Sequence, residues 1–309
     1  MTNFLLSVLI PVFNEEKNID PLLSRLLPII ERYNYEVIFI SDGSRDGTRE
    51  KILAAAHKNP RIKYLGFYRN FGHQLALTCG YLEAKGDCVV SIDADLQDPP
   101  ELIHDMVEKW QKGSKVIYAK RQSRDVDTYF KKQTAALFYR LINFLSETPI
   151  PEEVGDYRLL DKEVVAYLNN LPEHSRFLRG LVAWGGYPAE YVYFKREKRY
   201  SGETHYTISR MLNFALDGII SFSTKPLRIA SYVGFLSAGV GFMGIIYAIV
   251  GKLLLPSHMV TGWTALFVGV MFVGGVQLMT IGIIGEYISR IYTEIQKRPH
   301  FLVKERINL

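Results

Sequence analysis

Two aspartates at the end of an apolar run are suited to chemistry on a phosphorylated ligand. Asp93 and Asp95 follow the run Cys88–Ile92, and Gln97 comes shortly after them. An apolar run of this kind predicts a buried strand of a parallel sheet, and such sheets bind ligands at the carboxyl ends of their strands. Side chains two apart on an extended segment point the same way, so both carboxylates can face one ligand. Their oxygens and that of Gln97 suit Mg²⁺ or Mn²⁺, although an acidic turn before a helix starting at Pro99 gives the same pattern.

Apolar runs alternate with segments of helical spacing in the first part of the chain. Helices of about 12 residues between strands predict βαβ units and a mostly parallel sheet. We therefore expect a nucleotide-binding α/β domain over residues 1–125. The strands are expected at Leu5–Pro11, Tyr35–Ser41, Ile62–Phe67, Asp87–Asp93 and Lys115–Lys120.

Two long apolar stretches lie in the last third of the chain. Residues 229–250 and 263–284 contain no charged side chain. Each can cross the roughly 30 Å of bilayer hydrocarbon, which takes about 20 helical residues. Lys225 and Arg228 precede the first stretch, and further Lys and Arg residues follow the second. Because basic flanks remain on the cytoplasmic side, we expect a multi-pass hairpin in the cell (inner) membrane with the N-terminal domain and both termini in the cytoplasm.

Two amphipathic segments, residues 127–147 and 205–222, mix apolar with basic residues. They could cover the sheet or lie in the membrane interface, and their basic residues and the neighbouring hairpin favour the interface. The expected organisation is a cytoplasmic catalytic domain at 1–204, an interface helix at 205–228, the hairpin at 229–285 and a cytoplasmic basic tail at 286–309.

Charge and cysteine content narrow the class of protein further. The formal net charge is +5, from 37 Lys and Arg against 32 Asp and Glu, which is too mild to indicate a nucleic-acid partner. It fits an anionic membrane surface or phosphorylated ligands. Cys79 and Cys88 stand in apolar surroundings, so we expect buried, reduced thiols of a cytosolic domain.

Five motifs are spread over the first half of the chain: PVFNEE at 11–16, SDGSRDGT at 41–48, RNFG at 69–72, DADLQDPPE at 93–101 and GDYRLLD at 155–161. They occur in the order seen in family-2 glycosyltransferases. With the hairpin and GEYISRIY at 285–292, they make the chain resemble the polyprenyl-phosphate branch of that family, the bactoprenol glucosyltransferases and dolichol-phosphate mannose synthases. The resemblance implies a GT-A fold, transfer of a sugar from a nucleotide-sugar to a lipid phosphate, and inversion at the anomeric carbon.

The resemblance also implies roles for individual residues. Asp156 matches the family's proposed base position, where it would orient the acceptor, close the metal site or act as a base. Arg158 beside it could hold its carboxylate or be simply structural. Ser41 departs from the commoner paired acids, and His73 stands where relatives often carry Lys, which bears on donor choice. Matches to nucleotide-sugar positions are Pro11, Asn14, Glu15, Asp42, Asp93, Ala94 and Asp95, with Asp93, Asp95 and Gln97 at the metal.

The chemistry of such a transfer places its own demands on the site. A lipid monophosphate is already an anion near pH 7, since its second pKa is about 6, so a strong base is not needed. Cations are needed to bind and orient it, and Arg offers planar bidentate donors. We expect Arg121 and Arg199 in catalytic roles and Arg124, Lys131 and Arg196 on the lipid phosphate.

The leading hypothesis is a membrane-anchored transferase that moves glucose from a UDP-sugar to undecaprenyl phosphate for cell-envelope glycan modification. It would act as a homo-oligomer, up to a tetramer, with a flippase downstream. A processive polysaccharide synthase is one alternative, but its Q-x-x-R-W motif is not formed by Arg179 and Trp184. A non-catalytic partner of a lipid-linked sugar flippase is another, but it would have no use for the aspartate pair.

Overall fold

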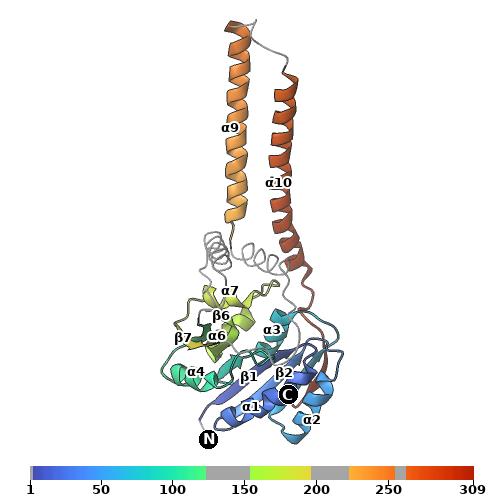
Figure 1. Ribbon diagram of the computed structural model, residues 1–309, viewed down its shortest axis with the longest axis vertical. Helices are drawn as coiled ribbons and strands as arrows, with labels where there is room; N and C mark the ends of the chain where they lie inside the picture. The colour runs from blue at the N-terminus through green and yellow to red at the C-terminus, as the bar shows by residue number, and fades with distance from the viewer. Residues whose placement is uncertain (1–2, 123–153, 196–222, 255–261) are drawn as a thin grey trace.

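The computed structural model describes residues 3–122, 154–195, 223–254 and 262–309. Within these residues an α/β domain holds the N-terminus and the C-terminus, and two long helices project from one end of it (Figure 1). The amphipathic segments expected at 127–147 and 205–222 lie outside the described residues.

The described strands include all five that the sequence predicts in the first part of the chain. They are β1 (Leu5–Val12), β2 (Asn34–Ser41), β3 (Ile62–Phe67), β4 (Cys88–Ser91), β5 (Val116–Arg121), β6 (Val154–Asp161), β7 (Ala189–Phe194) and β8 (Val303–Ile307). The helices are α1 (Glu16–Ile30), α2 (Thr48–Lys58), α3 (His73–Glu83), α4 (Leu102–Gln111), α6 (Lys162–Asn170), α7 (Leu178–Trp184), α9 (Lys225–Leu254) and α10 (Trp263–Gln296).

One sheet contains these strands in the order β7-β5-β6-β4-β1-β2-β3-β8. The pairs β1–β2, β1–β4, β2–β3 and β5–β7 are parallel, whereas β6 and β8 run antiparallel to their neighbours. The expected α/β fold with a mostly parallel sheet is therefore confirmed. The antiparallel β6 matters most for the site, because its first residues lie at the edge of the sheet where the parallel strands end.

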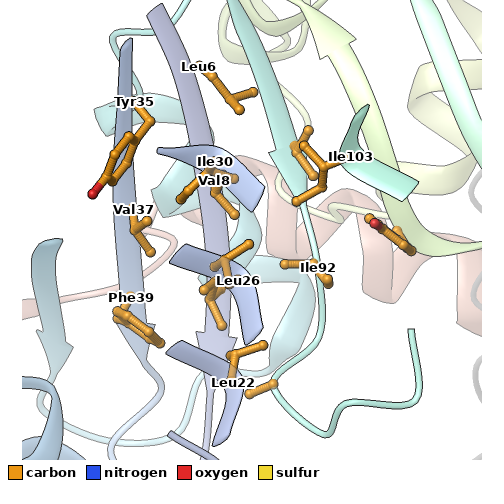
Figure 2. Packing of buried hydrophobic residues seen from close by; sticks show 14 of the residues in the cluster. Leu6, Val8, Leu22, Leu26, Ile30, Tyr35, Val37, Phe39, Ile92 and Ile103 are labelled. Carbon is orange, nitrogen blue, oxygen red and sulfur yellow. The ribbon is translucent and has the colours of Figure 1, made fainter. Parts of the chain in front are cut away.

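Apolar side chains on both faces of the sheet form the core. On one face α1 presents Leu22, Leu26 and Ile30, which are four residues apart and therefore share one side of the helix, toward Val8 and Phe39 of the central strands (Figure 2). A second cluster of buried apolar side chains covers the other face, where α3 packs on the sheet. Because the central strands are covered on both faces, they read as continuous apolar runs in the sequence.

The C-terminal residues belong to the sheet, so the basic tail expected at 286–309 is replaced by the end of α10 and by β8. Strand β8 pairs antiparallel with β3. Arg49 donates from Nε and Nη2 to the Glu305 carboxylate at 2.8 and 2.7 Å, and Asn308 donates to the carbonyl oxygens of Ala56 and Ile62. Three charges in the five residues VKERI conceal this edge strand in the sequence.

The projecting helices α9 and α10 lie side by side (Figure 1). Their segments Lys225–Gly244 and Gly269–Gln296 are long and apolar enough to cross a membrane, by length and composition. Hardly any side chain of these segments is buried, and most are exposed. Helix α9 already begins at Lys225, so the boundary expected at 228 falls inside it.

The two cysteines are free and buried, as the sequence predicts. Burial raises the pKa of the Cys79 thiol to about 12 and also raises that of Cys88. Both thiols are therefore protonated and unreactive at neutral pH.

We expect Leu26→Ala to destabilise the domain by about 2–5 kcal/mol, because it opens a cavity where α1 packs on the sheet. Leu26 is fully buried, whereas its neighbour Leu27 is only partly so. The apparent melting temperature of the purified protein measures the effect, with Leu27→Ala as the matched control. Equal shifts for the two variants would contradict this account of the core.

Candidate active site

The loops that follow β1 and β2 are joined by hydrogen bonds into one structure. The register of the two strands places Val12 beside Ser41. The Asn14 amide donates to Ser44 Oγ at 3.1 Å, and Asn14 Oδ1 accepts from the Arg45 amide at 2.9 Å. The Glu15 amide donates to Thr48 Oγ1 at 2.8 Å. The structure thus brings PVFNEE and SDGSRDGT together at the carboxyl edge of the sheet.

Asp42 is buried and fixes the RNFG turn that follows β3. Its carboxylate accepts from the amides of Phe71 and Gly72 at 2.6 and 2.9 Å. Burial raises the pKa of Asp42, and these two hydrogen bonds oppose that shift. Gly72 has φ +105°, a conformation that only glycine adopts easily. Asp42 therefore shapes the turn, and Pro11 lies buried within β1.

The predicted metal residues lie directly after β4. Asp95 is buried, and its Oδ1 accepts from the Gln97 amide at 3.1 Å, whereas the Asp93 side chain is 38% exposed. Ala94 between them is buried, and Leu96 turns the chain with φ +59°.

A divalent cation suits this pair of carboxylates. Burial raises the pKa of Asp93, the charge of His73 offsets part of that, and the negative charges of Asp156 and Asp95 add to it. A cation bound here would relieve the repulsion among the three carboxylates. In the described part of the chain no group of three or more His, Cys, Asp or Glu side chains could hold a metal. Mg²⁺ sites on phosphates commonly use only one or two protein carboxylates, so the residues fit such a site.

The antiparallel pairing of β4 with β6 places a third carboxylate opposite this pair. Cys88 pairs with Asp161 and Ser91 with Arg158, so the same register continued for two residues sets Asp93 opposite Asp156. His73, at the start of α3, lies between them, with Nε2 3.7 Å from Asp93 Oδ1 and 3.5 Å from Asp156 Oδ2.

The Asp156 carboxylate is surrounded by donors. Arg179 donates to it from Nε at 3.3 Å and from Nη2 at 3.0 Å, Arg158 from Nη2 at 3.1 Å, and Gln74 from Nε2 at 3.1 Å. The expected contact with Arg158 is confirmed. Burial alone would raise the pKa of Asp156, but the charge of Arg179, the hydrogen bond from His73 and the charge of Arg158 hold it well below its ordinary value.

This electrostatic environment has two consequences for Asp156. A carboxylate whose pKa is so low is a poor proton acceptor at neutral pH, which disfavours a role as a base. Because its pKa is lower in the folded than in the unfolded chain, the carboxylate stabilises the fold at pH values above about 4, and this stabilisation is lost as the pH falls through its folded pKa.

Arg121 lies at the end of β5, close to the first residues of β6. Its Nη2 is 3.8 Å from Asp98 Oδ1, and its side chain is 29% exposed. A Cβ at position 155 would come within 3.3 Å of the same nitrogen, so Gly155 leaves room for the guanidinium. The other basic candidates, Arg124, Lys131, Arg196 and Arg199, lie outside the described residues.

Sequence reasoning missed Arg179 and Gln74 as partners of Asp156. The sequence draws attention to Arg179 only through the Q-x-x-R-W motif, which it does not form with Trp184, and nothing else marks it among the other arginines. Gln74 follows His73 at the start of α3. Only the placement of β6 beside α3 and α7 shows that these side chains meet, and short sequence motifs carry no signal for that packing.

Comparison with known proteins agrees with this architecture. The chain resembles the crystal structure of glucosyl-3-phosphoglycerate synthase from Mycobacterium tuberculosis with a TM-score of 0.50 at 17% identity, covering 71% of this chain and 78% of that one. This likeness confirms the GT-A fold. Residues 7–168 match Glycosyl transferase family 2, and residues 225–291 match the GtrB C-terminal hairpin.

Relatives of similar length extend the match over almost the whole chain. The SfII prophage-derived bactoprenol glucosyl transferase of Shigella flexneri is 41% identical over 302 residues, which cover 97% of each protein. The uncharacterized glycosyltransferase YkcC of Bacillus subtilis (strain 168) is 44% identical over 301 residues, or 97% of this chain and 93% of that one. The chain therefore belongs to glycosyl transferase family 2, and it is a glycosyltransferase.

We expect Asp156→Asn to abolish sugar transfer and to lower the apparent melting temperature by about 5–10 °C, because Arg158 is then a buried charge without its counterion. Arg158 is fully buried. The double variant Asp156→Asn/Arg158→Met removes both charges and should recover most of the lost stability but none of the activity. Thermal unfolding and a transfer assay measure both effects, and an Asp156→Asn protein as stable as the wild type would refute this coupling.

Proposed function

We propose that the protein transfers glucose from UDP-glucose to undecaprenyl phosphate, with inversion at the anomeric carbon, on the cytoplasmic face of the membrane. The bactoprenol glucosyl transferase names of relatives 41% identical over nearly the full chain support the sugar and the polyprenyl acceptor. The distant GT-A structure was solved with Mn²⁺ and UDP-glucose, which supports the donor and a divalent metal.

The observation that carries this proposal is the state of Asp156. A sugar hydroxyl as acceptor would need a base to remove its proton, and Asp156 is held ionised by two arginines and hydrogen-bonded by Gln74. A lipid phosphate is already an anion near pH 7 and needs no such base. The site therefore suits a phosphate acceptor, and Asp156 has the role of orienting the cations around it.

The reaction follows from the groups at the carboxyl edge of the sheet. A phosphate oxygen of the acceptor attacks C1 of the sugar, the bond from C1 to the donor diphosphate breaks, and nucleoside diphosphate leaves with the electron pair. Asp93 and Asp95, with Gln97, would hold Mg²⁺ or Mn²⁺, which supplies neutralising charge for the leaving diphosphate. The loops carrying Asn14 and Glu15 bind the nucleotide.

The basic residues of the site serve the two phosphate groups. Arg121, whose guanidinium lies 3.8 Å from Asp98, is proposed to stabilise charge during transfer, a task that Arg performs with planar, paired donors. Arg199 shares this catalytic role in the proposal. Arg124, Lys131 and Arg196 bind the lipid phosphate.

Helices α9 and α10 anchor the enzyme where its acceptor lies. Both are long enough for the roughly 30 Å of hydrocarbon, and basic residues flank them on the side of the catalytic domain. In this proposal residues 205–222 lie in the membrane interface. The small-residue pairs Gly234/Ala238 and Ser237/Gly241 on α9 support close packing of helices from several copies of the chain. The proposal is a homo-oligomer of up to four chains, with a flippase acting on the product.

We expect the purified full-length protein to form glucosyl undecaprenyl phosphate from UDP-glucose when Mg²⁺ or Mn²⁺ is present, and to lose this activity in EDTA. Asp95→Asn should lower the rate by at least about 100-fold, because one of two metal carboxylates is removed. Asp105→Asn, an exposed aspartate on α4, is the matched control. Lipid-linked sugar and released nucleoside diphosphate are both measured, with GDP-mannose and UDP-N-acetylglucosamine as alternative donors.

The outcomes of this experiment separate the parts of the proposal. Product from a different donor would show that the transferred sugar is not glucose, and the proposed acceptor would stand. Absence of product from every donor in a folded protein would refute the lipid-phosphate acceptor. Undiminished product in EDTA and in Asp95→Asn would refute the metal site.

A further inference from the structure

Helix α10 continues well beyond the length that a membrane requires. Its 34 residues span about 51 Å, against roughly 30 Å of hydrocarbon. Near its end α10 contacts the chain just before α9 and the segment before α7: Tyr287 donates to the carbonyl oxygen of Ser223 at 2.7 Å, and Arg290 and Glu294 bind residues 174 and 175. These three side chains are partly buried and share one side of the helix.

Glu294 binds the backbone of the segment that leads into α7. Its carboxylate accepts from the amide of His174 at 2.8 and 3.0 Å and from the amide of Ser175 at 3.2 Å. Arg290 donates to Ser175 Oγ at 3.4 Å, and the His174 ring lies 2.7 Å from the carbonyl oxygen of Arg298. Hydrogen bonds to a charged carboxylate are about twice as strong as neutral ones, so Glu294 is the centre of this contact.

The same segment carries the groups that hold Asp156. Arg179 stands four positions after Ser175, and its guanidinium donates to the Asp156 carboxylate. The amide of Leu178 donates to Gln74 Oε1 at 3.2 Å, and Gln74 in turn donates to Asp156. Arg176, between these positions, is buried and donates to the carbonyl oxygen of Leu168 at 2.9 Å, which fixes the segment from its other side.

We propose that Glu294 is a positioning residue, through which the anchor helix α10 sets the place of Arg179 and hence of Asp156. The inference rests on the proposed function only where it assigns Asp156 a role in transfer. Losing Glu294 would free the backbone at 174 and 175, and Arg179 would no longer be held at a fixed distance from the carboxylate. Small misplacements of groups in an active site reduce turnover strongly.

The placement of the nucleotide loops predicts which kinetic constant changes. Asn14 and Asp42 follow β1 and β2, whereas Asp156 and Arg179 belong to β6 and α7, on the other side of β4 in the sheet. Release of the 174–179 segment should therefore lower kcat and leave the KM for the nucleotide-sugar nearly unchanged. General destabilisation of the domain would alter both constants.

The test compares Glu294→Ala and Glu294→Gln with Glu286→Ala, an exposed glutamate about two turns earlier on the same helix. The full-length protein is assayed with undecaprenyl phosphate, and kcat and donor KM are determined separately. Hydrogen exchange of the peptides covering 172–184 and 5–12 is measured on the same samples, so that one readout is independent of activity. Glu294→Gln keeps one acceptor oxygen and should fall between the wild type and Glu294→Ala.

We expect Glu294→Ala to lower kcat by about tenfold with donor KM within about twofold of wild type, and to speed exchange at 172–184 but not at 5–12. Glu286→Ala should match the wild type. The inference would be overturned if kcat and hydrogen exchange were unchanged in Glu294→Ala. It would also be overturned if exchange became equally faster in both peptides while kcat and donor KM both worsened. A wild-type protein inactive on undecaprenyl phosphate would refute the proposed acceptor alone, since the exchange readout still decides the role of Glu294.

Discussion

The buried charge cluster around Asp156 is the constraint that ties the elements of this enzyme together. Removing Asp156 and Arg158 from water is unfavourable unless each keeps its partner and further hydrogen bonds. These come from β6 itself, from Gln74 on α3 and from Arg179 on α7. Two helices on separate parts of the chain must therefore dock correctly before the cluster is stable, and the same docking completes the active site.

The direction of β6 explains how three carboxylates meet at one edge. A parallel strand would bring its last residue to the ligand edge, whereas the antiparallel β6 brings its first residues, so Asp156 faces Asp93. His73 lies between these two like charges. Partial removal from water lowers its pKa, but the hydrogen bond to Asp156 and the charges of both aspartates raise it more. With its pKa held so low, Asp156 removes protons poorly, and in the proposed function this suits an acceptor that arrives already ionised.

The sequence predicts the first half of the fold better than the second for a physical reason. Strands β1 to β5 are buried on both faces and appear as apolar runs, and their ends carry the aspartates and glycines of the turns. Strand β6 contains Asp156, Arg158 and Asp161 within eight residues, and β8 is a short charged edge strand, so neither shows a strand pattern. The D-x-D pair could be found from spacing, but the contact of Arg179 with Asp156 depends on tertiary packing that no local pattern records.

The C-terminal strand gives helix α10 a second attachment to the catalytic domain. With a free tail after α10, the contacts of Glu294 and Arg290 would be the attachment that remains between this helix and the domain in the described part of the chain. Instead the chain leaves α10, pairs as β8 with β3, and is held by the Arg49–Glu305 ion pair at the opposite end of the sheet from β7. Because α10 is also bound at Glu294, the domain is held at two separated points, which restricts its rotation about the helix axis. If the enzyme acts on a lipid phosphate as proposed, that restriction keeps its phosphate-binding groups at the depth where the acceptor carries its phosphate.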